Sequence, residues 1–201
     1  QEIVNPIAYT KTRLGQYDWS DDIVGNAFVE ITPIPNLKFK STVGAKLAYW
    51  GGGGFTPKYY LNASTLTSQN NISRTTNSGF AWNVENTLQY GKRFSEHNVN
   101  VLLGQGAYVD GIVASQGVTY FDIPVTNYQD ASFNFGATAA KKDAWASNGI
   151  THKVSSLFAR VNYDYMEKYL FTGIIRRDGS SRFGTNNKYG YFPSFSVGWV
   201  V

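Results

Sequence analysis

The chain has 201 residues, a net charge of +4, no cysteine and many Tyr, Phe and Gly residues, while charged residues make up only 16%. This composition favours an all-β fold, and the lack of cysteine excludes disulfide bonds and thiolate metal sites. The basic residues are scattered along the chain, so we expect no nucleic-acid partner. No apolar run approaches the roughly eighteen residues that a membrane-spanning helix needs.

Residues 1–22 are predicted to form a loop that leads into the first clear strand. Beyond this loop, apolar and polar residues alternate with the period of two that is typical of strands. The pattern is clearest in residues 37–50, which read LKFKSTVGAKLAYW. Seven segments follow this rule and are predicted to be strands: 23–32, 37–50, 80–90, 99–109, 157–165, 169–175 and 189–201.

The alternation gives the predicted strands one apolar and one polar side. If the strands cross a membrane, the residues that face lipid include Ile31, Phe39, Val43, Leu47, Val84, Leu88, Val101 and Val197. The residues that face the lumen or a plug then include Glu30, Lys38, Lys40, Lys46, Glu85, Arg160 and Asp164. Aromatic residues gather near both ends of the apolar side, as they do at membrane interfaces. Aromatic-rich strands that pack on a soluble core are the alternative at this point.

The connections between the predicted strands alternate strictly between short and long. The short ones are 33–36, 91–98 and 166–168, and the long ones are 51–79, 110–149 and 176–188. Transmembrane barrels have this arrangement, with tight periplasmic turns and long extracellular loops. Because an open sheet of seven strands leaves two edges unpaired, we expect antiparallel, up-and-down strands that form part of a larger transmembrane barrel.

The sequence offers little support for catalysis. The two histidines, His97 and His152, lie far apart and belong to no metal or nucleophile motif, so we expect no enzyme and no cofactor or metal. The predicted loop 110–149 carries aromatic residues among polar ones, which suits a sugar or a peptide. Its candidate ligand-contacting residues are Tyr120, Phe121, Tyr128 and Trp145. The alternative is that the aromatic rings form the loop's own small core. Residues 137–146 are compatible with a short helix.

Residues 176–184, which read RRDGSSRFG, concentrate three arginines between two predicted strands. Asp-Gly is a turn signal, serine hydroxyls bond the local backbone, and arginines bond carbonyl or carboxylate groups. We therefore predict that this segment is an ordered loop tip with a structural role. The residues of this predicted loop motif are Arg177, Asp178, Gly179, Ser180, Ser181 and Arg182.

Residues 159–201 closely resemble the SusC/RagA family of TonB-linked outer-membrane transporters of Bacteroidota. The resemblance rests on Arg160-Val161-Asn162-Tyr163, Lys168-Tyr169-Leu170, residues 177–184 and Gly190-Tyr191-Phe192-Pro193-Ser194. Upstream, Asn5-Pro6, Gly25-Asn26-Ala27 and residues 37–41 also look like the barrel of this family. The loops between these segments carry no comparable match.

The resemblance implies an outer-membrane barrel of about 22 strands with an N-terminal plug. Such a protein imports oligosaccharides or peptides with energy passed from TonB, and a SusD-like lipoprotein covers its outer mouth. By the same resemblance, residues 1–201 are a partial barrel domain, and the plug that contacts TonB is absent from them. The residues themselves leave open a different class of protein, a soluble β-rich module whose loops bind carbohydrate.

Overall fold

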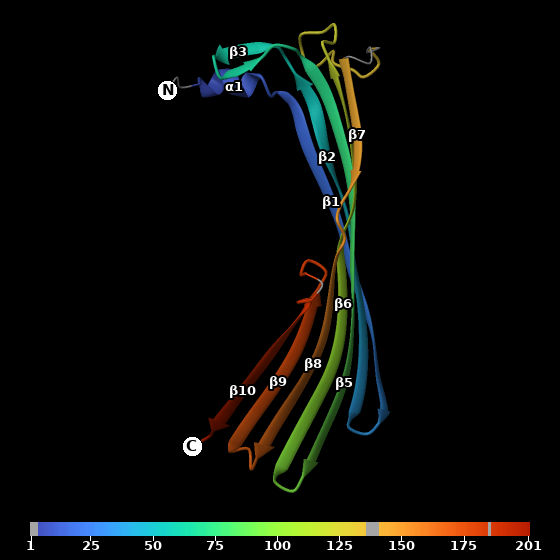
Figure 1. The fold of residues 1–201 in the computed structure, drawn as a ribbon, viewed down its shortest axis with the longest axis vertical. Helices are drawn as coiled ribbons and strands as arrows, with labels where there is room; N and C mark the ends of the chain where they lie inside the picture. Colours follow the sequence, from blue (N-terminus) through green and yellow to red (C-terminus); the bar gives the residue numbers. More distant parts are fainter. Residues whose placement is uncertain (1–3, 136–140, 185) are drawn as a thin grey trace. The chain divides into compact units, whose positions relative to one another are not determined.

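The computed structural model describes residues 4–135, 141–184 and 186–201 of the chain (Figure 1). Its strands pair almost entirely with neighbours along the chain. In chain order, the elements are α1 (Pro6–Lys11), β1 (Gly15–Ile34), β2 (Leu37–Thr56), β3 (Tyr59–Asn62), β4 (Thr65–Thr67), β5 (Asn71–Phe94), β6 (His97–Phe121), β7 (Lys142–Asn148), β8 (His152–Tyr165), β9 (Tyr169–Ser180) and β10 (Tyr189–Trp199).

Most strands belong to one antiparallel sheet. Its order is β1-β2-β5-β6-β8-β9-β10, and β7 pairs with residues 114–120 of β6. The strands β3 and β4 form a separate two-stranded sheet. Each of the seven predicted strands lies in one long strand of the main sheet, apart from the final two residues of 189–201, so the prediction of an all-β, up-and-down architecture is confirmed. No helix among the described residues is long and apolar enough to cross a membrane.

The long strands extend well beyond their predicted ends. β2 continues to Thr56 and β5 begins at Asn71, so the predicted loop 51–79 is largely strand. β6 continues to Phe121, so the predicted loop 110–149 is strand over 110–121 and again over 142–148. The alternation of apolar residues marks only the part of a strand that hides one face from water, whereas pairing requires only a neighbouring backbone. The extensions are polar and irregular in sequence, and they were therefore not predicted.

Two further predictions fail for local reasons. The predicted loop over residues 1–22 contains α1 and the start of β1, because Asn5 caps the helix by accepting hydrogen bonds from the backbone N–H groups of Ile7 and Ala8, at 3.0 and 3.3 Å. Pro6 then occupies the first helical turn, where a missing N–H costs nothing. The helix predicted for residues 137–146 is wrong over 142–146, which pair with β6 as part of β7, and residues 137–140 lie outside the described residues.

The chain divides into two units, which we describe separately. Unit 1 comprises residues 1–22, 48–79 and 113–149, and unit 2 comprises residues 23–47, 80–112 and 150–201. The described part of unit 2 is a single layer of strands with their connections. Unit 1 has a small core in which Phe55, Ile72 and Ile123 are buried.

The register of unit 2 gathers most large apolar side chains on one side of the sheet, while the other side carries most of the charged ones together with Leu102, Phe158, Leu170, Ile174 and Phe192. Residues that face each other across β6, β8, β9 and β10 all have the same parity, so the odd-numbered residues share one side of the sheet and the even-numbered residues share the other. One odd-numbered row consists of Val99, Tyr163, Phe171 and Val197. We call the odd-numbered side of these four strands the apolar face and the even-numbered side the polar face.

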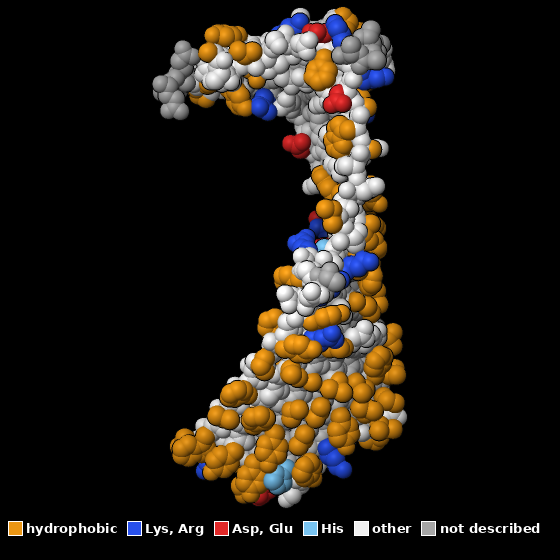
Figure 2. Space-filling view, in the orientation of Figure 1, with side chains coloured by type: hydrophobic (Ala, Val, Ile, Leu, Met, Phe, Trp, Pro, Cys, Tyr) orange, Lys and Arg blue, Asp and Glu red, His pale blue; other side chains and the backbone are white. Residues whose placement is uncertain are grey.

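The apolar face has no covering layer among the described residues of unit 2. Phe195 and Val197 on β10 are 81% and 82% exposed, and most large apolar residues of the face are at least a third exposed. Figure 2 shows hydrophobic side chains gathered over β8, β9 and β10. Arg160 and Asp164 lie on the polar face, as the alternation predicts. On β1 and β2, Glu30 and Lys38 also lie together, with Lys38 Nζ 2.9 Å from Glu30 Oε1.

Candidate functional site

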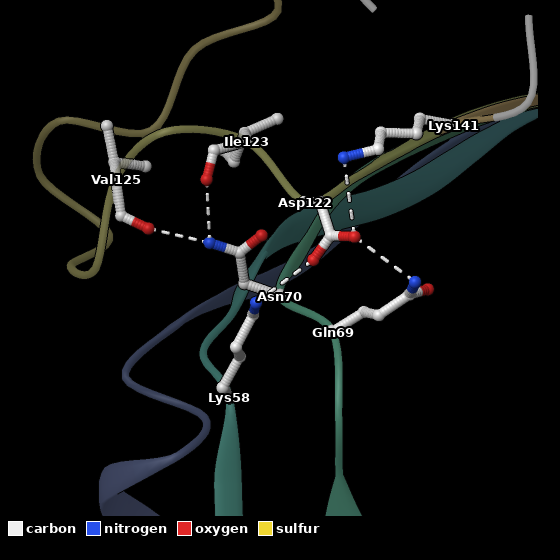
Figure 3. Close-up of polar contacts among 7 residues, drawn as sticks. All are labelled: Lys58, Gln69, Asn70, Asp122, Ile123, Val125 and Lys141. Carbon is white, nitrogen blue, oxygen red and sulfur yellow. Dashed lines mark hydrogen bonds and ion pairs between the residues drawn. The ribbon is translucent and has the colours of Figure 1, made fainter. Parts of the chain in front are cut away.

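The loop that follows β6 in unit 1 is held over its own small core. Ile123 is 6% exposed and packs with Phe55 and Ile72, and Phe133 packs against the same cluster. Asn70, which is 5% exposed, donates hydrogen bonds from Nδ2 to the carbonyl oxygens of Ile123 (2.9 Å) and Val125 (2.6 Å), as Figure 3 shows. A buried amide thus fixes the path of the chain where it leaves the strand.

Asp122 ties three further segments to the same place. Its carboxylate lies 3.1 Å from Lys58 Nζ and 3.6 Å from Lys141 Nζ, and it accepts a hydrogen bond of 3.1 Å from Gln69 Nε2 (Figure 3). The hydrogen bond with Lys58 lowers the pKa of Asp122 below its usual value, partial burial opposes this effect, and the charges of Lys58 and Lys141 add to it. The carboxylate therefore stays ionised at neutral pH and anchors the loop.

The four candidate ligand-contacting residues occupy different surroundings. Tyr120 packs against the core of unit 1, with its ring edge-on to Phe133 at 5.3 Å between centroids, and Phe121 is half-buried at the end of β6. Tyr128 and Trp145 are each 44% exposed. The alternative of a loop core therefore holds for Tyr120, and the surface positions belong to Tyr128 and Trp145.

Tyr128 and Trp145 line two shallow hollows that share one residue. The first has a volume of about 400 Å³ and is lined by Tyr17, Arg74, Tyr128 and Ser132, among others. The second, of about 340 Å³, is lined by Arg74, Gln116 and Trp145, among others. Arg74 contributes to both, so the same basic residue lines each hollow together with an aromatic residue. The sequence did not single out Arg74, because it falls in a predicted loop with no motif around it.

A hydrogen-bond network joins three strands on the polar face of unit 2. His152 Nδ1 lies 3.2 Å from Asp110 Oδ1, and His152 Nε2 lies 3.0 Å from Ser180 Oγ. Ser180 Oγ also accepts a hydrogen bond of 3.2 Å from the backbone N–H of Arg182. The network connects β6, β8 and β9 where β8 begins. No group of three or more His, Asp or Glu side chains in the described part of the chain is placed to hold a metal ion.

The segment RRDGSSRFG differs from the predicted loop tip. Asp178, Gly179 and Ser180 belong to β9 and are paired with β8, and Asp178 and Gly179 also pair with β10. The turn comes later, with Ser181 and Arg182. The Asp-Gly signal is overridden here because partners on both sides supply a complete backbone ladder. Gly179 also leaves room for the Tyr189 ring, which a Cβ at this position would strike.

Comparison with known proteins finds relatives of this chain, although no family model matches it. The TonB-dependent receptors P39 and P3 of Formosa agariphila are 29% and 31% identical to it over 98% of its length, which covers 18% and 19% of those proteins. The TonB-dependent receptor SusC of Bacteroides thetaiotaomicron is 26% identical over 98% of the chain and 18% of its own length.

Solved structures show the same fold. The structure of the RagAB peptide transporter superposes with a TM-score of 0.69 at 19% identity, over 94% of this chain and 20% of that one. The closed-closed state of the RagAB peptide importer gives a TM-score of 0.72 at 20% identity, with the same coverage. This chain matches a barrel segment of the SusC/RagA-like TonB-dependent receptors. The SusC-like segment spans about a fifth of the length of its curated relatives.

The match confirms the resemblance drawn from residues 159–201 and extends it to nearly the whole chain. It also explains the open sheet of the SusC-like segment, since the corresponding part of a large barrel has neighbours on both sides. The relatives are named as receptors and transporters, which agrees with the expectation that the chain is not an enzyme. The names do not bear on the roles of Tyr120, Phe121, Tyr128 and Trp145.

Proposed function

We propose that this chain is part of the barrel wall of a TonB-dependent, SusC-like importer in the outer membrane. Its apolar face meets lipid, and its polar face meets the lumen or the plug of the intact protein. The observation that carries the proposal is the uncovered apolar face of unit 2. A large apolar side chain contributes roughly 1.5 to 3 kcal/mol when it is removed from water, and here lipid is the solvent that removes it.

The alternative of a soluble carbohydrate-binding module fits the structure poorly. A soluble sheet of this size needs a second layer on its apolar side, as in sandwiches and small closed barrels. The described residues of unit 2 provide no such layer, and the buried hydrophobic residues that the structure does have are Phe55, Ile72, Val109 and Ile123. Three of these four belong to the loop core of unit 1.

The cargo of the proposed importer is an oligosaccharide or a peptide. The RagAB complexes, whose fold this chain shares, are a peptide transporter and importer, which supports a peptide as one of the two cargoes. We propose that a SusD-like surface lipoprotein covers the outer mouth, and that TonB supplies energy through a plug encoded elsewhere in the intact protein. Of the four candidate residues, Tyr128 and Trp145 are the best placed to contact cargo, because they are exposed and line hollows to which Arg74 also contributes.

Fractionation of the intact protein tests the membrane assignment. We expect the protein to sediment with outer membranes and to require detergent for extraction. Recovery as a monodisperse protein in buffer without detergent would contradict the proposal. Growth of a deletion strain on single oligosaccharides and on peptide mixtures tests the cargo, since the strain should lose growth on one class of nutrient while it grows normally on glucose.

A further inference from the structure

Two cations lie on the apolar face near the end of β9 that adjoins residues 181–188. Arg177 and Lys153 have odd numbers and therefore share this face. The odd-numbered positions of the registered parts of β6, β8, β9 and β10 include no Asp or Glu. The apolar face thus carries positive charge with no acidic residue beside it.

The neighbouring arginine shows how unusual this is. Arg176 lies on the polar face, where its Nε donates hydrogen bonds of 2.8 and 2.7 Å to the two carboxylate oxygens of Asp178. The guanidinium of Arg177 instead lies over the ring of Tyr189, with Cζ 3.7 Å from the ring centroid. Its Nε is buried and has no hydrogen-bond partner. A guanidinium stacked on a ring keeps its N–H groups at the edge of its plane, where they remain directed at an outside acceptor.

Two hollows run along the apolar face on either side of Arg177. The first, of about 320 Å³, is lined mainly by apolar side chains: Leu103, Leu157, Ala159 and Ile175, with Arg177 and Tyr191. The second, of about 330 Å³, is lined by the small residues Ala107, Ser155 and Gly179, by the cations Lys153 and Lys188, and by Tyr189, among others. Ala107, Ser155 and Gly179 form one cross-strand row, so the second hollow exists because three adjacent strands carry small residues at the same level.

The position of Arg177 along the strand matches the edge of a membrane. Tyr165, Tyr169 and Trp199 form an aromatic row at the opposite end of the apolar face. From Tyr169 to Arg177 the strand rises about 27 Å, at roughly 3.4 Å per residue. For a strand tilted by about 40°, this corresponds to about 21 Å along the membrane normal, which is close to the height of the apolar band of an outer-membrane barrel. Arg177 therefore lies at the far interface, where headgroups begin.

We propose that these two hollows form a binding site for one lipid with a phosphate-bearing, negatively charged headgroup. The headgroup lies in the second hollow beside Lys153 and accepts hydrogen bonds from Arg177, whose guanidinium lies over the Tyr189 ring that lines this hollow, while an acyl chain lies in the first hollow along Leu103, Ala159 and Ile175. The site rests on the proposed function, because the groove meets lipid only if the apolar face does.

Lipid retention by the intact protein tests the site. The protein is reconstituted in nanodiscs made of equal amounts of phosphatidylcholine and phosphatidylglycerol, and native mass spectrometry counts the lipids that stay bound. We expect a phosphatidylglycerol molecule to be retained in preference to phosphatidylcholine. Arg177→Gln should weaken this retention about tenfold or more, because it removes a charge-assisted hydrogen bond. Arg177→Lys keeps the charge and should retain most of the preference.

Two further variants make the result specific. Arg160→Gln removes the same charge from the polar face and should leave lipid retention unchanged. Ala107→Leu keeps both cations but fills the second hollow, so it should also abolish the preference, and it serves if Arg177→Gln fails to fold. Equal retention of both lipids by the wild type, or full retention in both Arg177→Gln and Ala107→Leu, would overturn the site. Failure of the wild-type protein to fractionate with outer membranes would instead overturn the proposed function.

Discussion

Asp122 Oδ1 lies 3.1 Å from Lys58 Nζ, and this ion pair joins the loop after β6 to the segment between β2 and β3. Because the pKa of Asp122 is lowered in the folded loop, the ionised carboxylate stabilises the loop at neutral pH. This stabilisation is complete above the usual pKa of 3.8 and is lost as the pH falls through the lowered folded value. We expect hydrogen exchange of residues 122–125, corrected for intrinsic rates, to become faster in that acid range.

The variant Asp122→Asn isolates this effect. It should exchange faster than the wild type at pH 7, and the difference should vanish in acid, where the wild-type carboxylate is also neutral. Asp130→Asn is the matched control, because Asp130 lies in the same loop and accepts a hydrogen bond from Asn127 rather than from a lysine. An equal change at Asp130, or a difference that persists in acid, would argue against the role of the Lys58 ion pair.

Asn70→Ala should loosen the same loop without a dependence on pH. The side chain of Asn70 is buried and donates to the carbonyl oxygens of Ile123 and Val125. Its removal breaks both hydrogen bonds, and although the Ile123 carbonyl keeps the bond from the Val125 N–H, we expect a cost of about 1 to 3 kcal/mol. Hydrogen exchange over residues 122–133 measures the loss. Asn134→Ala changes an exposed asparagine of the same loop and should have little effect. If the two variants behave alike, the amide of Asn70 does not hold the loop.

Adjacent residues of β10 provide a sharp test of the two faces. Val197 lies on the apolar face and Ser196 on the polar face, and both are exposed. An arginine that faces the hydrocarbon costs about 2 to 4 kcal/mol at mid-depth and less towards the interface, and Val197 lies two residues inside the aromatic row, so its cost falls below this maximum. Val197→Arg should therefore reduce the amount of intact protein assembled in the outer membrane, whereas Ser196→Arg should be tolerated. Quantitative blotting of membrane fractions measures both, and equal assembly of the two variants would contradict the assigned faces.

Leu47 and Lys46 on β2 allow the same test, because adjacent residues of a strand point to opposite sides of the sheet. Leu47→Arg should impair assembly of the intact barrel, because it introduces a charge on the side predicted to face lipid. Lys46→Gln removes a charge from the other side and should assemble normally. Resistance to extraction by carbonate distinguishes assembled from unassembled protein. Normal assembly of Leu47→Arg would indicate that this part of β2 does not face lipid.

Tyr128→Ala tests the contact with cargo. The exposed ring lines the hollow shared with Arg74, and loss of a stacking ring costs about 0.5 to 1.5 kcal/mol, or two- to tenfold in affinity. We expect uptake of the cargo by the intact importer to fall by this factor while the amount of protein in the membrane stays constant. Tyr60→Ala is the control, because Tyr60 is 71% exposed on β3 and lines neither hollow. Equal uptake by both variants would remove Tyr128 from the proposed site.

The sequence predicted the strand segments in which one side is apolar and the other is polar. In residues 37–50 and 80–90 one side must be apolar, so the alternation reveals both the strand and its faces. β5 begins at Asn71, but residues 71–79 show no such alternation, because nothing requires one side of the strand to be apolar there. The Asn5-Pro6 pair does carry a helix-start signal, and the prediction of a loop over 1–22 overlooked it.

Less of the candidate site could be predicted from the sequence. Asn70 and Ile123 are 53 residues apart, and nothing in the residues around Asn70 indicates that its amide is buried. The role of Tyr120 in the loop core follows from its packing against Phe133 and not from its neighbours in sequence. The sequence showed that Arg176 and Arg177 belong to an arginine-rich segment. It did not show that they lie on opposite faces, because this follows only if the strand continues through Asp178.

The network of Asp110, His152 and Ser180 limits how far changes elsewhere in the chain can disturb the strand pairing of unit 2. It fastens β6, β8 and β9 with polar side chains at one level, so these strands keep their register at that level whatever the connections beyond it contain. Insertions or deletions beyond that level should therefore leave the pairing of these three strands intact. Strand register and the surface beyond the network can change independently because different residues determine them.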